Sequence, residues 1–291
     1  MRETQLEHGG TQQLGFRPLR RPLPYLDHCR VVLPFRPSRA QVLARFSGRV
    51  FAGLLPVPRR KEILELARHV DPACPSDLPR RLFQHAVEQS TLLLTGGWNC
   101  LDLEPLRDLD GIWTQSGVPT LFLSMHHGNW EWLAGILHRL RPDAIGVARS
   151  AHHPLGQGLL EFVRHFHRTP VHYDNRGFKN AHRTLARGGL VAFLPDQRPP
   201  SGSEPGVWLG QPTQVTPLPR RWSRSHRPDL WIGHLTPSSP TSYVFELYRY
   251  PPEAAEFWDR LLDFHFVPWV AQAPDLHFGF FHRRLVPRET F

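Results

Sequence analysis

The sequence predicts an α/β fold: one domain with a mainly parallel central sheet flanked by helices, lying within residues 25–291. In the centre of the chain, short apolar runs of strand length at residues 120–125, 144–148 and 190–194 alternate with segments of helical periodicity. The links between them are short, as in right-handed βαβ units on a parallel sheet. The chain has 291 residues, 40% of them apolar, and no repeat or domain-sized linker, which favours one core.

The first third of the chain is predicted to be mostly helical. Residues 1–24 are basic and contain proline, and we expect a flexible segment there. Helices are expected at residues 40–55, 56–69 and 78–94, the last with Gly96-Gly97 as a stop signal. The first helix combines large apolar residues with three arginines, so it could lie on an anionic membrane or pack on the domain with its arginines in water.

The α/β part begins at about residue 118 with a strand, a tight turn and a helix. The apolar run 120–125 is followed by the polar turn His126-His127-Gly128-Asn129 and then by a helical pattern from Trp130. Asn129 is suited to cap this helix, and Glu131 to its positive end. The turn therefore lies at the carboxyl end of a strand, where open α/β sheets bind ligands.

The remaining elements continue this alternation. Helices are expected at residues 159–167 and 180–187, and strands at 169–173 and 190–194. A polar loop at 198–206 precedes a basic segment with Arg220, Arg221, Arg224 and Arg227. Strands at 230–235 and 243–248 and a helix at 253–266 complete the prediction.

Three predicted strands end in polar residues that can do chemistry: His126 with Glu131, Arg149, and Asp196 with Gln197. Adjacent parallel strands would bring them to one edge of the sheet. Four residues separate His126 from Glu131, a spacing that can return a carboxylate to an imidazole and improve it as a base. No serine or cysteine adjoins this pair, so the nucleophile could be a substrate hydroxyl. The alternative is a capped turn with two surface histidines.

The composition narrows the classes of partner. A formal charge of +9 favours an anionic partner: nucleic acid, an anionic membrane surface, an acidic carrier protein or a phosphorylated glycolipid. The three scattered cysteines indicate a reducing compartment and neither disulfides nor zinc. No stretch reaches the ~20 apolar residues of a membrane span, and no signal peptide is apparent. We expect a cytoplasmic protein, peripheral to the inner face of the cytoplasmic membrane.

The motif HHGNWE at residues 126–131 resembles the histidine–four residues–acid (HX4E) motif of glycerolipid acyltransferases. Its Gly-Asn-Trp-Glu residues are similar to those of the motif in the bacterial lipid A biosynthesis (lauroyl/myristoyl) acyltransferase family, within the lysophospholipid acyltransferase superfamily. Weaker similarities follow in the family's order at residues 147–149, 153–154, 164, 194–197, 207–210 and 281–284. The segment after Gln197 departs from the family by its many prolines and arginines.

The resemblance implies a glycerolipid-acyltransferase-like fold and transfer of a fatty acyl chain from an acyl thioester to a hydroxyl of a lipid or glycolipid. It implies His126 as general base and Glu131 as its partner. The residues expected to stabilise the oxyanion or bind the acceptor are Arg164, Arg149 and Asn129, with Asp196 and Gln197 in support. The donor would be acyl carrier protein or a coenzyme A thioester; no metal or other cofactor is expected.

Two other classes of function remain open. The arginines from Arg220 to Arg227 could contact nucleic-acid phosphates in a binding module without catalysis, although no nucleic-acid-binding motif is apparent and no nucleic-acid partner is expected. His126, His127 and Glu131 could belong to a metal-dependent hydrolase, although adjacent histidines rarely bind one metal and no third ligand is apparent from the spacing.

Overall fold

A seven-stranded sheet forms the centre of the computed structural model, which describes residues 25–36, 38–109, 111–150, 158, 161, 164, 170–197 and 202–281. The strand order is β1-β9-β8-β2-β5-β3-β4. Five strands run parallel: β8 (Asp229–Ser239), β2 (Thr120–Leu123), β5 (Leu190–Phe193), β3 (Ile145–Ala148) and β4 (Val171–Tyr173). β9 (Ser242–Tyr250) is antiparallel to both β8 and β1 (Asp27–Pro34). The predicted α/β class with a mainly parallel sheet is confirmed.

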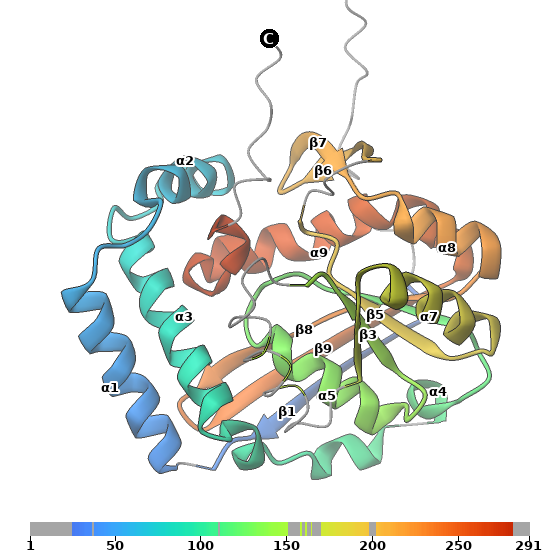
Figure 1. Ribbon diagram of the computed structural model, residues 1–291, viewed down its shortest axis with the longest axis horizontal. Helices are drawn as coiled ribbons and strands as arrows, with labels where there is room; N and C mark the ends of the chain where they lie inside the picture. The colour runs from blue at the N-terminus through green and yellow to red at the C-terminus, as the bar shows by residue number, and fades with distance from the viewer. Residues whose placement is uncertain are drawn as a thin grey trace, which may run out of the picture.

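Helices cover both faces of this sheet (Figure 1). All four residues of the central strand β2 are buried, as expected for a parallel strand covered on both sides. Leu121 and Leu123 point into one core, with α2 (Arg60–Val70), α7 (Asp174–Ala186), α8 (Leu218–His226) and α9 (Trp258–Gln272). Phe122 points into the other core, with α5 (Trp130–Leu140).

The first third is mostly helical, as predicted. It forms α1 (Arg39–Leu54), α2 and α3 (Leu78–Leu94), and Figure 1 shows α1 and α3 side by side at one edge of the molecule. The two helices approach closely because α1 turns small residues toward α3. A Cβ on Gly48 would lie 2.5 Å from Cγ of Glu88. No helix within the described ranges is both long enough and apolar enough to cross a membrane.

Three elements differ from the sequence prediction. Strand β1 occupies residues for which no element was predicted, and it pairs with β9 along its length. A hairpin of β6 (Glu204–Trp208) and β7 (Gln211–Val215) begins within the polar loop predicted at 198–206. Proline is rare inside strands, so Pro205 and Pro212 made these two strands hard to predict. The last predicted helix, at 253–266, begins as a 3-10 helix, η3 (Pro252–Phe257), and its remaining residues belong to α9, which continues to Gln272.

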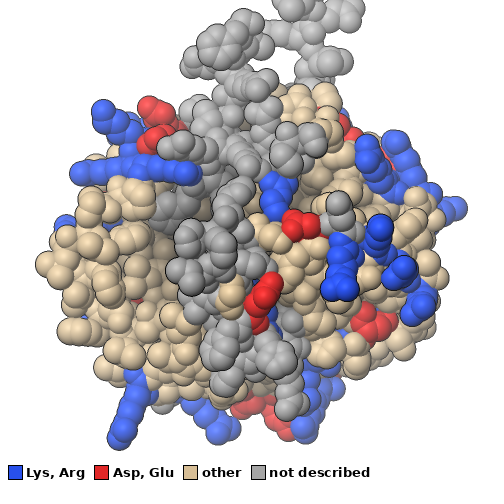
Figure 2. All heavy atoms as spheres, in the orientation of Figure 1, with Lys and Arg blue, Asp and Glu red and all other residues tan. Residues whose placement is uncertain are grey.

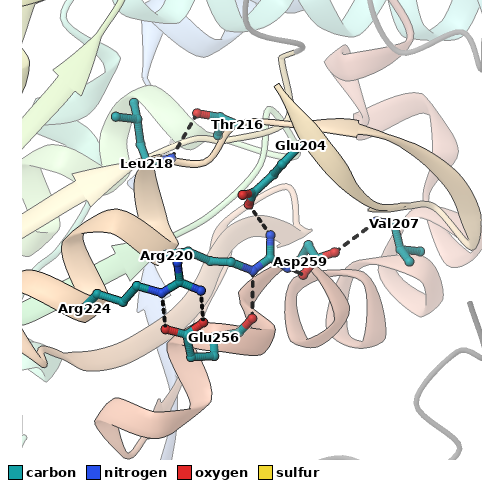
Figure 3. A network of polar contacts seen from close by, with 8 residues as sticks. All are labelled: Glu204, Val207, Thr216, Leu218, Arg220, Arg224, Glu256 and Asp259. Atoms are coloured by element: carbon teal, nitrogen blue, oxygen red, sulfur yellow. Dashed lines mark hydrogen bonds and ion pairs between the residues drawn. The ribbon is translucent and has the colours of Figure 1, made fainter. Parts of the chain in front are cut away.

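Arg220 of α8 ties this hairpin to the body of the protein (Figure 3). Its guanidinium contacts the carboxylates of Glu204 on β6 and Asp259 on α9, the latter at 2.5 Å. Its Nε donates to the carbonyl oxygen of Glu256 at 2.9 Å. Asp259 also accepts the backbone N–H of Val207 at 3.0 Å. One buried carboxylate thus holds both the arginine and the strand.

Candidate functional site

Polar side chains from four neighbouring parallel strands come to one edge of the sheet. His126 follows β2, Asp196 follows β5, Arg149 follows β3, and Tyr173 is the last residue of β4. These strands are adjacent in the order β2-β5-β3-β4, so their carboxyl ends lie next to one another, as the sequence predicts. This edge is where open parallel sheets bind their ligands.

The turn between β2 and α5 has its shape because of Gly128. Its φ of 62° is in the left-handed region, and a Cβ at this position would lie 2.2 Å from the carbonyl oxygen of Leu235. The backbone N–H of Asn129 donates to that same oxygen at 2.8 Å, and the N–H of Gly128 donates to the carbonyl of Leu276 at 2.9 Å. The turn is therefore packed against β8 and the 3-10 helix η4 (Pro274–Leu276).

His126 is held by the carboxylate of Asp196. Nδ1 of the imidazole lies 2.6 Å from Oδ1 of Asp196, and the backbone N–H of His126 donates to Oδ2 at 2.7 Å. The Asp196 side chain is fully buried, whereas that of His126 is 18% exposed. A carboxylate on Nδ1 accepts the proton of that nitrogen and puts the ring's lone pair on Nε2, the tautomer of a general base.

Glu131 is paired with Arg164. Nε and Nη2 of the guanidinium donate to the two carboxylate oxygens at 3.0 and 2.7 Å, in a bidentate geometry. Nη1 of Arg164 donates to the hydroxyl of Tyr173 at 2.8 Å. Both charged side chains are only 15% exposed, so the pair is largely shielded from water. Sequence reasoning assigned no role to Tyr173, although its place at the end of a fourth strand was a signal.

This arrangement differs from the expected pairing of Glu131 with His126. The carboxylate bonded to Nδ1 is that of Asp196, which was expected only to support the site. Burial acts to raise the pKa of Glu131, but the charge and hydrogen bonds of Arg164 outweigh it and hold that pKa below its usual range, with His126 adding to this effect. Glu131 is therefore an anion close to His126.

An aromatic wall stands beside the imidazole. The ring of Trp130 lies 5.2 Å from that of His126 and packs edge-on against Phe278 at 4.4 Å, measured between centroids. The backbone N–H of Phe278 donates to the carbonyl of His126 at 2.7 Å. His126 thus has the Glu131–Arg164 ion pair near it and the apolar ring of Trp130 beside it.

His127 takes no part in this site. Its ring is buried and lies about 6 Å from His234, His277 and Phe266, between centroids. Burial lowers the pKa of His127 to about 4, so the ring is neutral near pH 7. Within the described residues, no group of three histidine, cysteine, aspartate or glutamate side chains has the geometry of a metal site.

The other predicted site residues lie around this centre. Asn129 is at the N-cap position of α5, but its buried side chain makes no capping hydrogen bond. Arg149 is exposed after β3, and Gln197 is half-buried after Asp196. The predicted elements at residues 153–154 and 282–284 lie outside the described residues, and of the helix expected at 159–167 only Glu161 and Arg164 are described.

Comparison with protein-family models and with curated proteins finds no match to this chain. Function must therefore be inferred from the site, which offers three things at one edge of the sheet. It has an imidazole on a buried carboxylate, a guanidinium held in a bidentate pair, and an aromatic wall.

Proposed function

We propose that this protein is an O-acyltransferase that moves a fatty acyl chain from an acyl thioester of coenzyme A or acyl carrier protein to a hydroxyl of a lipid or glycolipid. The observation that carries the proposal is the His126–Asp196 pair at the ligand-binding edge of the sheet. Such a pair can act as general base for a nucleophile that the substrate supplies, and a hydroxyl of pKa far above 7 requires general-base help.

In the proposed reaction, Nε2 of His126 takes the proton of the acceptor hydroxyl as its oxygen attacks the thioester carbon. The C–O bond forms and the carbonyl electrons move onto the oxygen. The intermediate then expels the thiolate, which recovers the proton from Nε2. Asp196 keeps the ring in the reactive tautomer and stabilises the imidazolium between these two transfers.

Arg164 is the proposed stabiliser of the oxyanion or of an acceptor phosphate. A guanidinium fixed by Glu131 and Tyr173 loses little freedom when an anion arrives, which is the condition for electrostatic preorganisation. Glu131 then acts mainly by positioning Arg164 through the bidentate pair. This assigns Glu131 a different contact from the one implied by the HX4E resemblance.

The aromatic wall supports a hydrophobic substrate. Trp130 presents ring surface next to the imidazole and packs on the buried ring of Phe278, and the carbon chain of a reacting thioester would lie against Trp130. A donor with a coenzyme A or carrier-protein group would also suit the formal charge of +9.

Three of the four arginines considered for nucleic-acid phosphates have carboxylate partners. Arg220 contacts Glu204 and Asp259, Arg224 contacts Glu256 with two bonds of 3.1 Å, and Arg227 contacts Glu253 at 2.8 Å. Figure 3 shows the first two within one network. A basic helix already paired with carboxylates gives no particular support to the binding-module alternative.

Lipid mass spectrometry of cells with and without the gene tests the proposal, with complementation by the wild type, His126→Ala or His28→Ala. His28 is the matched control, because it lies on β1 at the other end of the sheet. We expect one lipid to lose an acyl chain without the gene and to regain it with the wild type and His28→Ala only. An unchanged lipid profile with the protein expressed, or full rescue by His126→Ala, would overturn the proposal.

A further inference from the structure

Helix α1 has its large apolar side chains on the outside. The residues that face the protein are small: Ala44, Gly48 and Ala52 are buried against α3. The opposite side carries the large ones, which are exposed by 70% at Val42, 65% at Phe46 and 78% at Leu54, with Leu43, Phe51 and Leu55 about half exposed. In Figure 2 this side, at the left edge where α1 lies in Figure 1, is mostly uncharged.

The charges around this outer face have one sign. Helix α1 contains Arg39, Arg45 and Arg49 and no acidic residue. All three arginines are exposed, and none forms an ion pair with another described residue. Glu88 on α3 lies beside Gly48 of α1, and burial raises its pKa although the charges of Arg45 and Arg49 act to lower it.

We infer that the outer face of α1 docks on an anionic membrane surface. Clustered large apolar residues on the surface of a soluble domain indicate an interaction site, and a basic border selects anionic lipids as the occupant. A helix lying in the bilayer interface places its apolar side chains among the acyl chains and its arginines among the headgroups. The inference depends on this face alone and not on the proposed acyl transfer.

The docking face is one helix away from the candidate site. Helix α3 packs on α1 through Gln84 and Glu88, at the position where Gly48 allows close approach. His85, which follows Gln84 on α3, points toward the site: its ring centroid lies 5.8 Å from that of Phe278 in the aromatic wall. A membrane under α1 would therefore hold the site close to the lipid surface.

Flotation of the full-length protein with vesicles tests the inference, using vesicles of phosphatidylcholine alone or with 30 mol% phosphatidylglycerol. We expect binding to the anionic vesicles. The double variant Phe46→Gln/Leu54→Gln should weaken it by at least tenfold, since two large side chains no longer enter the bilayer. Phe178→Gln on α7 is the matched control for an exposed aromatic residue, and it should bind like the wild type.

The charge requirement is tested by Arg45→Gln/Arg49→Gln, which should lower affinity for the anionic vesicles by about fivefold for each arginine. The inference is overturned if the wild type binds neither vesicle, or if the Phe46→Gln/Leu54→Gln variant binds like Phe178→Gln. It is also overturned if light scattering shows a wild-type dimer that does not float with vesicles and that the same variant converts to a monomer, since a second copy would then cover the face.

Discussion

Replacing Asp196 with asparagine should switch the tautomer of His126 with little change in shape. The amide oxygen of the variant side chain can keep the backbone N–H of His126, which is bonded at 2.7 Å in the wild type. The amide NH2 then faces Nδ1, at the position where the carboxylate oxygen lies at 2.6 Å. An amide donates there, so Nδ1 must accept and the ring proton moves to Nε2. The nitrogen that faces the substrate would then carry a proton and could not act as a base.

The expected loss in turnover is about 10³- to 10⁴-fold, the size of the effect when a carboxylate partner of a general-base histidine becomes an amide. This corresponds to ~4 to 5.5 kcal/mol of transition-state stabilisation. The folded protein loses much less, because both contacts with His126 remain hydrogen-bonded, the one at Nδ1 with its direction reversed, and the neutral amide needs no compensation for burial. A decrease of about 1 to 3 kcal/mol in the free energy of unfolding is expected.

One measurement reports the loss of turnover, and a second reports the change of tautomer. Release of free thiol from a long-chain acyl-coenzyme A, in the presence of a lipid extract as acceptor, measures turnover. Nitrogen-15 shifts of the histidine ring report which nitrogen carries the proton. Asp229→Asn is the matched control: this carboxylate contacts Arg249 at 2.7 Å and begins β8, at the opposite edge of the sheet. Wild-type turnover in Asp196→Asn, or an unprotonated Nε2 in that variant, would refute the reasoning.

Three further predictions concern other parts of the structure. Arg164→Lys keeps the charge but loses the bidentate fork, and should lower turnover at least tenfold with the donor KM unchanged; a raised KM alone would indicate a binding residue. Gly128→Ala should destabilise the fold by about 3 kcal/mol in denaturant unfolding, whereas Gly53→Ala, with open space around it, should cost nothing. Burial lowers the pKa of His127 and His265 to about 4, so below pH 6.5 the unfolded chain binds more protons. Stability should fall as the pH drops from 6.5 to 4, by about 2 kcal/mol per histidine at pH 5; a flat profile in urea titrations would contradict this.

The helices and buried strands could be predicted because their signals are local. Helix α3 begins and ends where its periodicity predicts, and β5 agrees with its apolar run to within one residue. Strand β1 could not be found in this way, since its residues alternate between exposed and half-buried positions and it depends on pairing with β9. The β6–β7 hairpin likewise depends on contacts with Arg220 and Asp259, far along the chain.

The site could be predicted as a set of strand ends but not as a set of pairs. Spacing suggested Glu131 as the carboxylate for His126, because sequence alone reveals only neighbours along the chain. The pairing follows from register: Leu123 of β2 is opposite Phe193 of β5. His126 and Asp196 each lie three residues beyond that pair, so parallel strands of equal extension bring them side by side. Both strand ends could be identified in the sequence, but the register between β2 and β5 could not be predicted from it.

The sequence is ambiguous for helix α1 as well: it does not determine which of the two faces of this helix is buried. Periodicity identifies two faces, and the usual assumption is that the larger apolar residues are the buried ones. Here the stripe Ala44-Gly48-Ala52, with a spacing of four residues, allows α3 to approach so closely that the small face is the buried one. The large side chains then point outward beside arginines, and that combination would suit a surface which is apolar and anionic together. A lipid bilayer has both properties, which is why the orientation of α1, once known, favours the membrane over water as the medium this helix faces.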